Sequence, residues 1–525
     1  MSFDIRFYGR DFTEISKDLS RTKVSEDNIE INVSDDVKLR IFKHFLDSVK
    51  DEFTSVVANR RPGTKIRNPK LFIDNSGDYR FDGYVGVVTK TIAMQRSDII
   101  EEVVSEESKE EEIKVTLQIQ SRFDCMDEKE FKPYFLVTML KSVFDIKTMT
   151  AIPSNEEDFF YFLLIIMFRN HVLEAYRKGY YKTYHRFEEN NDRIRGSIDI
   201  SRHIKLNMGM KNGKVAYSYR EHTTNNYLNH LIIEAFTYLK RRYPNFVNDM
   251  IDNNRNFGKI MEQLKYDIGY PKYSPGILIS KNSKPLSHPF FTEYEQLRKT
   301  SLKVLRDESL SPFGDTAGHQ VEGFLFYIPD LWEMFLEKNM KLDHFIINGQ
   351  TEIKTFDYND SNDYKQKTFP DYVFYHEDER DKPFMILDAK FKPAWGERIG
   401  TRSTLGDWLL DDYRRCIQYM NSINGHATGT IFPTSDDSIC IEESKWKDQL
   451  TEFCVHKISE YNTIDRFYTI PVYVLPTNAL KYEEWIDSFK NTLNITMELL
   501  NDCVKKEYDY AKKILSAYSE LAVNR

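Results

Sequence analysis

The order of apolar segments between residues 329 and 433 restricts the fold more than any other feature of this sequence. Apolar residues recur there with helical spacing in two segments and as short strand-like runs in four others. In chain order, the segments are a helix from Pro329, strands at 345–347, 371–375 and 384–391, a helix over 405–420 and a strand at 428–432. The resulting order, α-β-β-β-α-β, indicates an α/β domain.

Two further parts precede this domain. Residues 1–150 predict a β-rich domain, because short alternating runs such as 84–88 and 115–119 recur between polar loops. Residues 151–310 predict a mainly helical domain, since apolar residues return there at helical spacing. With the α/β domain over residues 311–525, we predict an α+β protein of several domains.

Composition excludes several classes of protein. The formal net charge of −9 argues against nucleic-acid binding by bulk charge, so any such contact must be local. The five cysteines contain no Cys-x-x-Cys pair, which disfavours structural zinc and a disulfide framework. No signal peptide is recognised, and the longest apolar stretch, 159–168, is too short to span a bilayer. We therefore expect a cytoplasmic protein that does not associate with a membrane.

The chemistry is concentrated where two predicted strands end. Asp371 opens one strand, and Asp388-Ala389-Lys390 closes the next. Side chains alternate along a strand, so Asp388 and Lys390 share a face, and pairing of the two strands brings Asp371 toward Asp388. Two adjacent carboxylates repel each other, and a bound divalent cation relieves that repulsion. Hard oxygen ligands favour Mg²⁺, with Mn²⁺ as a substitute.

Phosphodiester hydrolysis is the reaction that this set of residues suits best. A bound metal polarises the phosphoryl oxygen and lowers the pKa of a water molecule. Lys390 acts either as a base toward that water or as an electrostatic clamp, and the sequence leaves both roles open. The alternative is that both aspartates cap strand ends and that Lys390 is a solvated surface residue.

Other candidate residues lie on the two helices beside these strands. Glu333 and Glu337 are one helical turn apart, and one of them, Glu333 by preference, is expected to complete the metal site; a solvated acidic face is the alternative. The predicted phosphate contacts are Lys392, Arg414, Arg415, Gln418 and, in a basic stretch of the middle domain, Arg195. Asp411 and Asp412 are equally expected to neutralise the two arginines.

The sequence resembles the McrC family, the nuclease subunits of McrBC-type and LlaJI-type restriction systems. The resemblance covers most of the chain and rests on motifs in family order: 84–88, 195–199, 221–230, Leu331-Trp332-Glu333, Pro370-Asp371, 386–392 and 429–433. It implies a PD-(D/E)xK nuclease core over the α-β-β-β-α-β segment, with Asp371, Asp388 and Lys390 as its catalytic residues. One departure is Arg414, which follows Tyr413 where many relatives have glutamine.

The resemblance also implies a partner, an AAA+ GTPase hexamer of the McrB type that binds GTP and translocates DNA. Residues 1–150 are then expected to dock on that ring. The sequence itself has no phosphate-binding loop, because no Gly-Lys-Ser/Thr follows Gly314 and Gly318. The absence of this loop agrees with a motor that is carried by another chain.

These expectations combine into one function with two rivals. The chain is expected to cleave double-stranded DNA with Mg²⁺ as the nuclease subunit of a GTP-dependent restriction system. One rival is a non-catalytic adaptor that activates the nucleotide hydrolysis of its partner. The other is a stand-alone nuclease of DNA repair or transposition.

Overall fold

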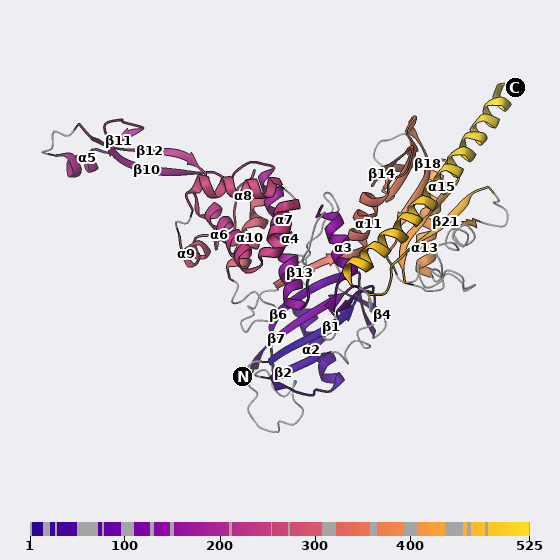
Figure 1. The fold of residues 1–525 in the computed structure, drawn as a ribbon, viewed down its shortest axis with the longest axis horizontal. Helices are drawn as coiled ribbons and strands as arrows, with labels where there is room; N and C mark the ends of the chain where they lie inside the picture. The colour runs from indigo at the N-terminus through magenta and orange to yellow at the C-terminus, as the bar shows by residue number, and fades with distance from the viewer. Residues whose placement is uncertain are drawn as a thin grey trace. The chain divides into compact units, whose positions relative to one another are not determined.

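In the computed structural model, the chain forms two compact units (Figure 1). Unit 1 combines Met1–Val143 with Gly318–Arg525, and unit 2 comprises Phe144–Ala317. The parts predicted as N-terminal and C-terminal domains thus pack in one unit. The structure describes residues 3–13, 22–26, 29–49, 72–75, 78–95, 110–126, 131–146, 152–208, 213–253, 255–270, 273–306, 322–357, 365–392, 407–435, 455–458, 464–477 and 481–523. Gly314 and Gly318 lie outside these ranges.

The first sheet of unit 1 is built mainly from N-terminal residues. Its strands, in spatial order, are β13 (Glu322–Tyr327), β6 (Tyr84–Gln95), β7 (Glu110–Gln120), β1 (Phe3–Arg10), β2 (Lys23–Glu26) and β3 (Ile29–Glu30). The helix α2 (Asp35–Val49) supplies Phe42 to the sheet's apolar core, where its ring lies 4.9 Å from that of Phe7. The core is therefore shared by a helix and strands, whereas the sequence predicted only strands in this part of the chain.

Strand β13 follows unit 2 in the sequence but belongs to this N-terminal sheet. It pairs antiparallel with β6, with Phe324 opposite Val87. Gly86 and Gly323 permit the pairing because both have positive φ, and a Cβ atom on either would lie within 2.1 Å of a backbone oxygen across the pair. The N-terminal sheet is thereby continuous with the chain that enters the second sheet.

The second sheet of unit 1 holds the predicted α/β elements. Its spatial order is β14 (Phe345–Gly349), β17 (Tyr372–His376), β18 (Glu379–Ala389), β19 (Ala427–Thr434), β21 (Arg466–Tyr473) and β20 (Val455–Lys457). β17 and β18 are antiparallel, whereas β19 lies parallel to β18 and is reached through α13 (Asp407–Ser422). β19 is buried at every position and β18 is buried over Phe384–Asp388, as expected for strands covered by helices.

Three helices of unit 1 meet in an aromatic cluster beside this sheet. They are α3 (Tyr134–Val143), α11 (Ile328–Asn339) and α15 (Tyr482–Val523). Phe135, Trp332 and Phe489 pack there with Phe391, which directly follows Lys390. Three short pairs complete the unit: β4 (Phe72–Asn75) with β5 (Asp78–Phe81), β8 (Cys125–Met126) with β9 (Phe131–Lys132), and β15 (Ile353–Asp357) with β16 (Lys365–Thr368).

Unit 2 consists of a helical body and an arm. The body contains α4 (Glu156–Tyr176), α6 (Tyr227–Arg242), α7 (Pro244–Asn253), α8 (Arg255–Ile268), α9 (Pro275–Lys281) and α10 (Glu293–Leu305). Asn155 and Asn226 begin α4 and α6, where each side chain accepts a backbone N–H of the first turn. Over Glu157–Tyr176, α4 is long and apolar enough to cross a membrane, which corrects the length predicted for this stretch. Its most apolar window is 78% buried, as in a core helix.

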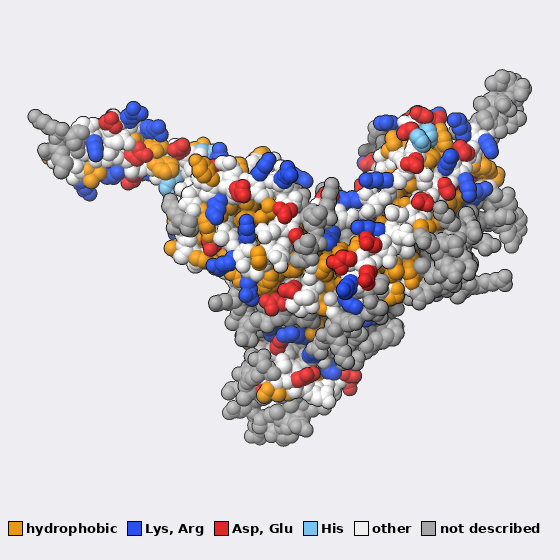
Figure 2. All heavy atoms as spheres, viewed as in Figure 1, with side chains coloured by type: hydrophobic (Ala, Val, Ile, Leu, Met, Phe, Trp, Pro, Cys, Tyr) orange, Lys and Arg blue, Asp and Glu red, His pale blue; other side chains and the backbone are white. Residues whose placement is uncertain are grey.

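The arm of unit 2 (residues 183–223) is a three-stranded sheet with one short helix. Figure 1 shows the hairpin of β10 (Thr183–Asn191) and β12 (Val215–Thr223) projecting from the helices, with β11 (Ser197–Ile198) and α5 (Ile200–Asn207) at its far end. Hydrophobic, basic and acidic side chains are all visible on its surface in Figure 2. The exposed apolar residues include Ile198, Ile200, Leu206 and Met208.

The structure confirms a mixed α+β architecture with more than one compact unit. Every segment of the α-β-β-β-α-β order predicted between residues 329 and 433 is present, and β15 and β16 form a separate pair between β14 and β17 in the sequence. The predicted β-rich and helical parts also contain elements of the other type: α2 and α3 in the first, and the arm in the second.

Candidate functional site

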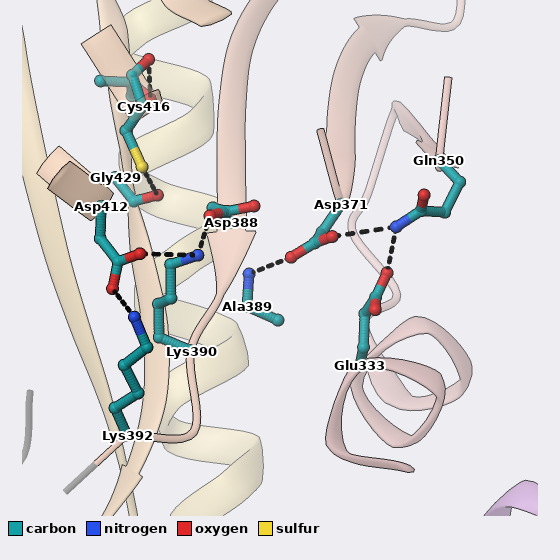
Figure 3. A network of polar contacts seen from close by, with 11 residues as sticks. Glu333, Gln350, Asp371, Asp388, Ala389, Lys390, Lys392, Asp412, Cys416 and Gly429 are labelled. Carbon is teal, nitrogen blue, oxygen red and sulfur yellow. Dashed lines mark hydrogen bonds and ion pairs between the residues drawn. The ribbon is translucent and has the colours of Figure 1, made fainter. Parts of the chain in front are cut away.

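The ends of β17 and β18 bring Asp371 and Asp388 together. The strands pair as predicted, with Tyr372 opposite Leu387, so the two aspartates stand at adjoining positions. Asp371 Oδ2 accepts the backbone N–H of Ala389 at 2.8 Å. This hydrogen bond fixes the Asp371 carboxylate against the strand that carries Asp388 and Lys390 (Figure 3).

Glu333 joins this pair from α11. Its side chain is buried, whereas Glu337, one turn later, is exposed and lies against Gly349 at the end of β14. The hydroxyl of Tyr372 donates to the backbone oxygen of Glu333 at 2.7 Å, which anchors α11 on β17. The predicted preference for Glu333 thus has a geometric basis.

Gln350 links Glu333 to Asp371. Its Nε2 donates to Glu333 Oε1 at 2.6 Å and to Asp371 Oδ1 at 3.0 Å. Its backbone has a φ of 50°, a left-handed conformation that is unfavourable for a residue with a side chain. The backbone N–H of Gln350 also donates to the Asp371 backbone oxygen at 3.2 Å, so the turn is held to β17 in two places.

The three carboxylates interact electrostatically. Burial raises the pKa of Asp371 well above its ordinary value, and the neighbouring carboxylates of Asp388 and Glu333 raise it further. Lys390 opposes this effect. A cation placed among these groups would therefore be strongly attracted.

Lys390 lies between two buried aspartates. Its Nζ forms an ion pair with Asp388 and lies 3.6 Å from Asp412 Oδ1, on α13. Burial opposes the charge on Lys390, but the carboxylates of Asp388 and Asp412 outweigh it and raise the lysine's pKa. Asp412 also accepts Lys392 Nζ at 2.9 Å. In Figure 3 both lysines point toward Asp412.

The residues fit a divalent cation by chemistry. Glu333, Asp371 and Asp388 supply hard oxygen donors that repel one another. Among the residues that the structure describes, no three His, Cys, Asp or Glu side chains converge as metal ligands. The Gln350 amide, the Ala389 N–H and the Lys390 ammonium instead share the carboxylate oxygens. Carboxylate oxygens are the kind of ligand that Mg²⁺ prefers, and in this structure protein donors contact them.

The predicted phosphate contacts are dispersed. Lys392 belongs to the site because it forms an ion pair with Asp412. Arg414, Arg415 and Gln418 lie on the exposed face of α13. Arg414 pairs with Asp411 at 3.5 Å, as one alternative predicted, but Asp412 is buried and pairs with the two lysines instead. Arg195 belongs to the arm of unit 2, where it is exposed.

Sequence reasoning missed two residues of this site. Asp412 shares the buried face of α13 with Cys416 and Met420, and that helical spacing was a usable signal for an inward-facing carboxylate. Gln350 carried no comparable signal, because its position depends on a left-handed turn that brings it between two distant elements.

Comparison with known proteins gives one family and no curated relative. Residues 103–406 match the model of the McrBC 5-methylcytosine restriction system component. No curated protein matches the chain. One similar solved structure is a refined half-complex from a tetradecameric assembly of Thermococcus gammatolerans McrB AAA+ hexamers with bound McrC. The identity is 13% and the TM-score 0.45, over 95% of this chain and 100% of that chain. The cryo-EM structure of the Thermococcus gammatolerans McrBC complex is 13% identical with a TM-score of 0.27, over 64% of this chain and 89% of that chain.

Proposed function

The chain belongs to the family of McrBC 5-methylcytosine restriction system components, and on this premise we propose that it is the nuclease subunit of such a system. The observation that carries the proposal is that Asp371, Asp388 and Lys390 lie at adjoining strand ends, with Glu333 of α11 linked to Asp371 through Gln350. A structural role alone does not require three mutually repelling carboxylates beside a buried lysine. The α-β-β-β-α-β order around them is the order expected for a PD-(D/E)xK core, which supports the proposal.

In this proposal Glu333, Asp371 and Asp388 hold Mg²⁺, or Mn²⁺ in its place. The bound ion supplies Lewis-acid polarisation of a DNA phosphodiester and a more acidic water molecule. The protein's own residues orient the site: the Gln350 amide and the Ala389 N–H fix the Asp371 carboxylate. Lys390 adds a positive charge beside Asp388, where negative charge develops during hydrolysis.

Asp412 acts as a positioning residue in this scheme. It contacts Lys390 and Lys392 but belongs to a helix separate from the strands that carry the carboxylates. Holding both lysines from α13 keeps their ammonium groups near the strand end, where a DNA phosphate would approach. Supporting residues of this kind commonly affect catalysis almost as strongly as the groups they orient.

We further propose that the nuclease works in the cytoplasm with an AAA+ GTPase of the McrB type. The partner binds GTP and moves along double-stranded DNA, and this chain cleaves that DNA. Docking on the partner is assigned to residues 1–150, nearly all of which belong to unit 1.

The metal requirement tests this function. Plasmid DNA is incubated with the chain, the AAA+ partner and GTP, and cleavage is compared in Mg²⁺, Mn²⁺, Ca²⁺ and EDTA. We expect cleavage with Mg²⁺ or Mn²⁺ only. Cleavage in EDTA would refute the metal mechanism. Partner stimulation without any cleavage of a modified target would favour the adaptor, and cleavage without the partner would favour a stand-alone nuclease.

A further inference from the structure

Positive charge is concentrated in unit 2. Phe144–Ala317 contains 26 Lys and Arg residues against 20 Asp and Glu residues, whereas the remainder of the chain contains 47 against 62. Unit 2 therefore carries a net charge of +6 within a chain of net charge −9. A local basic region is what an acidic protein needs to contact a polyanion.

A pocket of about 370 Å³ lies among α6, α9 and the segment that follows α9. Lys281, Lys284 and His288 line it, with the aromatic rings of Tyr181 and Tyr227. The one buried cation in its wall, Arg298, is already neutralised by Glu295, with Nη2 and Oε1 2.7 Å apart. The net charge of the pocket therefore comes from its exposed cations.

The floor of this pocket is rigidly built. Asn282 is buried, and its Nδ2 donates to the backbone oxygens of Tyr227 at 3.1 Å and Leu278 at 2.8 Å. The Arg298 guanidinium donates to the Asn282 backbone oxygen. Glu295 accepts the backbone N–H of Leu286 at 2.8 Å, which fixes the segment after α9. The floor of the pocket is thus held in place before any ligand binds, and the exposed lysines project from its rim.

The exposed rim supplies hydrogen-bond donors. Among the described residues, Lys281 and Lys284 form no ion pair with a carboxylate, and the ammonium of Lys281 lies 5.8 Å from the centre of the Tyr227 ring. His288 Nδ1 accepts the backbone N–H groups of Phe290 and Phe291 at 3.2 and 3.4 Å. That arrangement leaves the proton of the neutral ring on Nε2, as a further donor.

We propose that this pocket of unit 2 binds backbone phosphates of DNA at a site separate from the nuclease residues. Lys281 and Lys284 supply the charge, and the Nε2–H of His288 supplies a directed hydrogen bond. The Tyr227 ring, 39% exposed, offers a face for the adjoining sugar or base. The pocket reads no sequence, because its donors address the phosphate rather than base edges.

Fluorescence anisotropy with the full chain and a labelled DNA duplex tests this site. The measurements are made in EDTA over a range of NaCl concentrations, with wild type and with Lys281→Gln/Lys284→Gln. The control removes two exposed charges of the same unit outside the pocket, as Lys240→Gln/Arg241→Gln. We expect the pocket variant to bind about tenfold more weakly at low salt and its salt slope to fall by about 1.8, at about 0.9 for each lost phosphate contact. The control is expected to change affinity by less than about twofold.

Equal losses in the two double variants, or no loss in the pocket variant, would overturn the site. Binding of inorganic phosphate that disappears in the pocket variant, with unchanged DNA binding, would assign the pocket to a free anion and overturn the DNA assignment. This inference rests on the proposed function, because it assumes that DNA is the substrate. Because binding is measured without metal, its failure is distinct from a failure of cleavage.

Discussion

The buried carboxylate of Asp412 lies 3.6 Å from the ammonium group of Lys390. Its second oxygen accepts Lys392, so one side chain of α13 holds two cations of the neighbouring strand end. This arrangement separates the positioning of the lysines from the carboxylates that are proposed to bind metal. It also makes the contribution of α13 measurable by itself.

Replacement of Asp412 by Asn is expected to lower kcat for DNA cleavage by about 10- to 100-fold, with a smaller change in KM. The lysines lose the charge that holds them, whereas Glu333, Asp371 and Asp388 are retained. Asp411→Asn is the matched control, because Asp411 is exposed and pairs with Arg414 on the surface of α13. A loss of activity equal in both variants, or one explained entirely by a lower folded fraction, would contradict the positioning role.

Two substitutions of Gln350 separate its side chain from its backbone conformation. Gln350→Ala and Gln350→Gly both remove the amide that bridges Glu333 and Asp371, and both are expected to reduce cleavage. Only Gly relieves the left-handed φ of 50°, so Gln350→Gly is expected to be about 1 kcal/mol more stable than Gln350→Ala. Urea unfolding measures the difference. Equal stability of the two variants would mean that the turn is unstrained.

Arg122 joins the N-terminal sheet to the end of the candidate site. It pairs with the buried Asp11 at 2.8 Å and donates to the backbone oxygen of Phe391 at 2.6 Å. Burial raises the pKa of Asp11, and Arg122 opposes that rise, so loss of the arginine leaves a poorly solvated carboxylate. Arg122→Met is expected to destabilise unit 1 by about 3–5 kcal/mol.

The double variant Arg122→Met/Asp11→Asn is the control for this pair. Removing the charge of Asp11 as well is expected to restore part of the lost stability, because no buried charge is then left alone. Thermal unfolding of wild type, Arg122→Met, Asp11→Asn and the double variant completes the cycle. Additive losses would show that the two side chains are not coupled.

Stability of unit 2 is expected to fall in mild acid because of His171. Burial, followed by the nearby charge of Lys303, lowers the pKa of His171 to about 4. The unfolded chain takes up this proton near pH 6.5 and the folded chain does not, so the stabilisation is complete above about pH 6.5 and is lost as the pH falls toward 4. Between about pH 7.5 and pH 5, the loss is about 2 kcal/mol.

His171→Asn removes this titration while retaining a polar partner for Thr300, which lies 2.9 Å from the imidazole Nδ1. The variant is expected to be less stable overall but to lose about 2 kcal/mol less than wild type between the two pH values. Urea unfolding at both pH values gives the comparison. Parallel pH profiles for the two proteins would show that His171 does not carry the effect.

The sequence predicted local structure and chemistry better than long-range packing. The strands carrying Asp371 and Asp388 were recognisable because apolar residues alternate or cluster over a few positions, and their pairing follows from one short turn. The pairing of β13 with β6 was not recognisable from the sequence, because it joins segments separated by all of unit 2 and depends on Gly86 and Gly323. For this reason the N-terminal and C-terminal parts appeared to be independent domains.

The candidate site shows the same division. Glu333 could be preferred because it adjoins the apolar Trp332, and burial of Glu333 but not Glu337 agrees with that choice. Gln350 could not be found, because a single residue in a left-handed turn leaves no periodic pattern. The catalytic roles of Asp371, Asp388 and Lys390 remain predictions of chemistry, supported by their proximity.

The nuclease site is best tested with Asp388→Asn, in the presence of the AAA+ partner, Mg²⁺, GTP and a long DNA that carries the target. Both DNA cleavage and GTP hydrolysis by the partner are measured for wild type and variant. We predict that the variant loses cleavage and still supports GTP hydrolysis at the wild-type rate. Cleavage by the variant at the wild-type rate would contradict the assignment of these residues as a nuclease site.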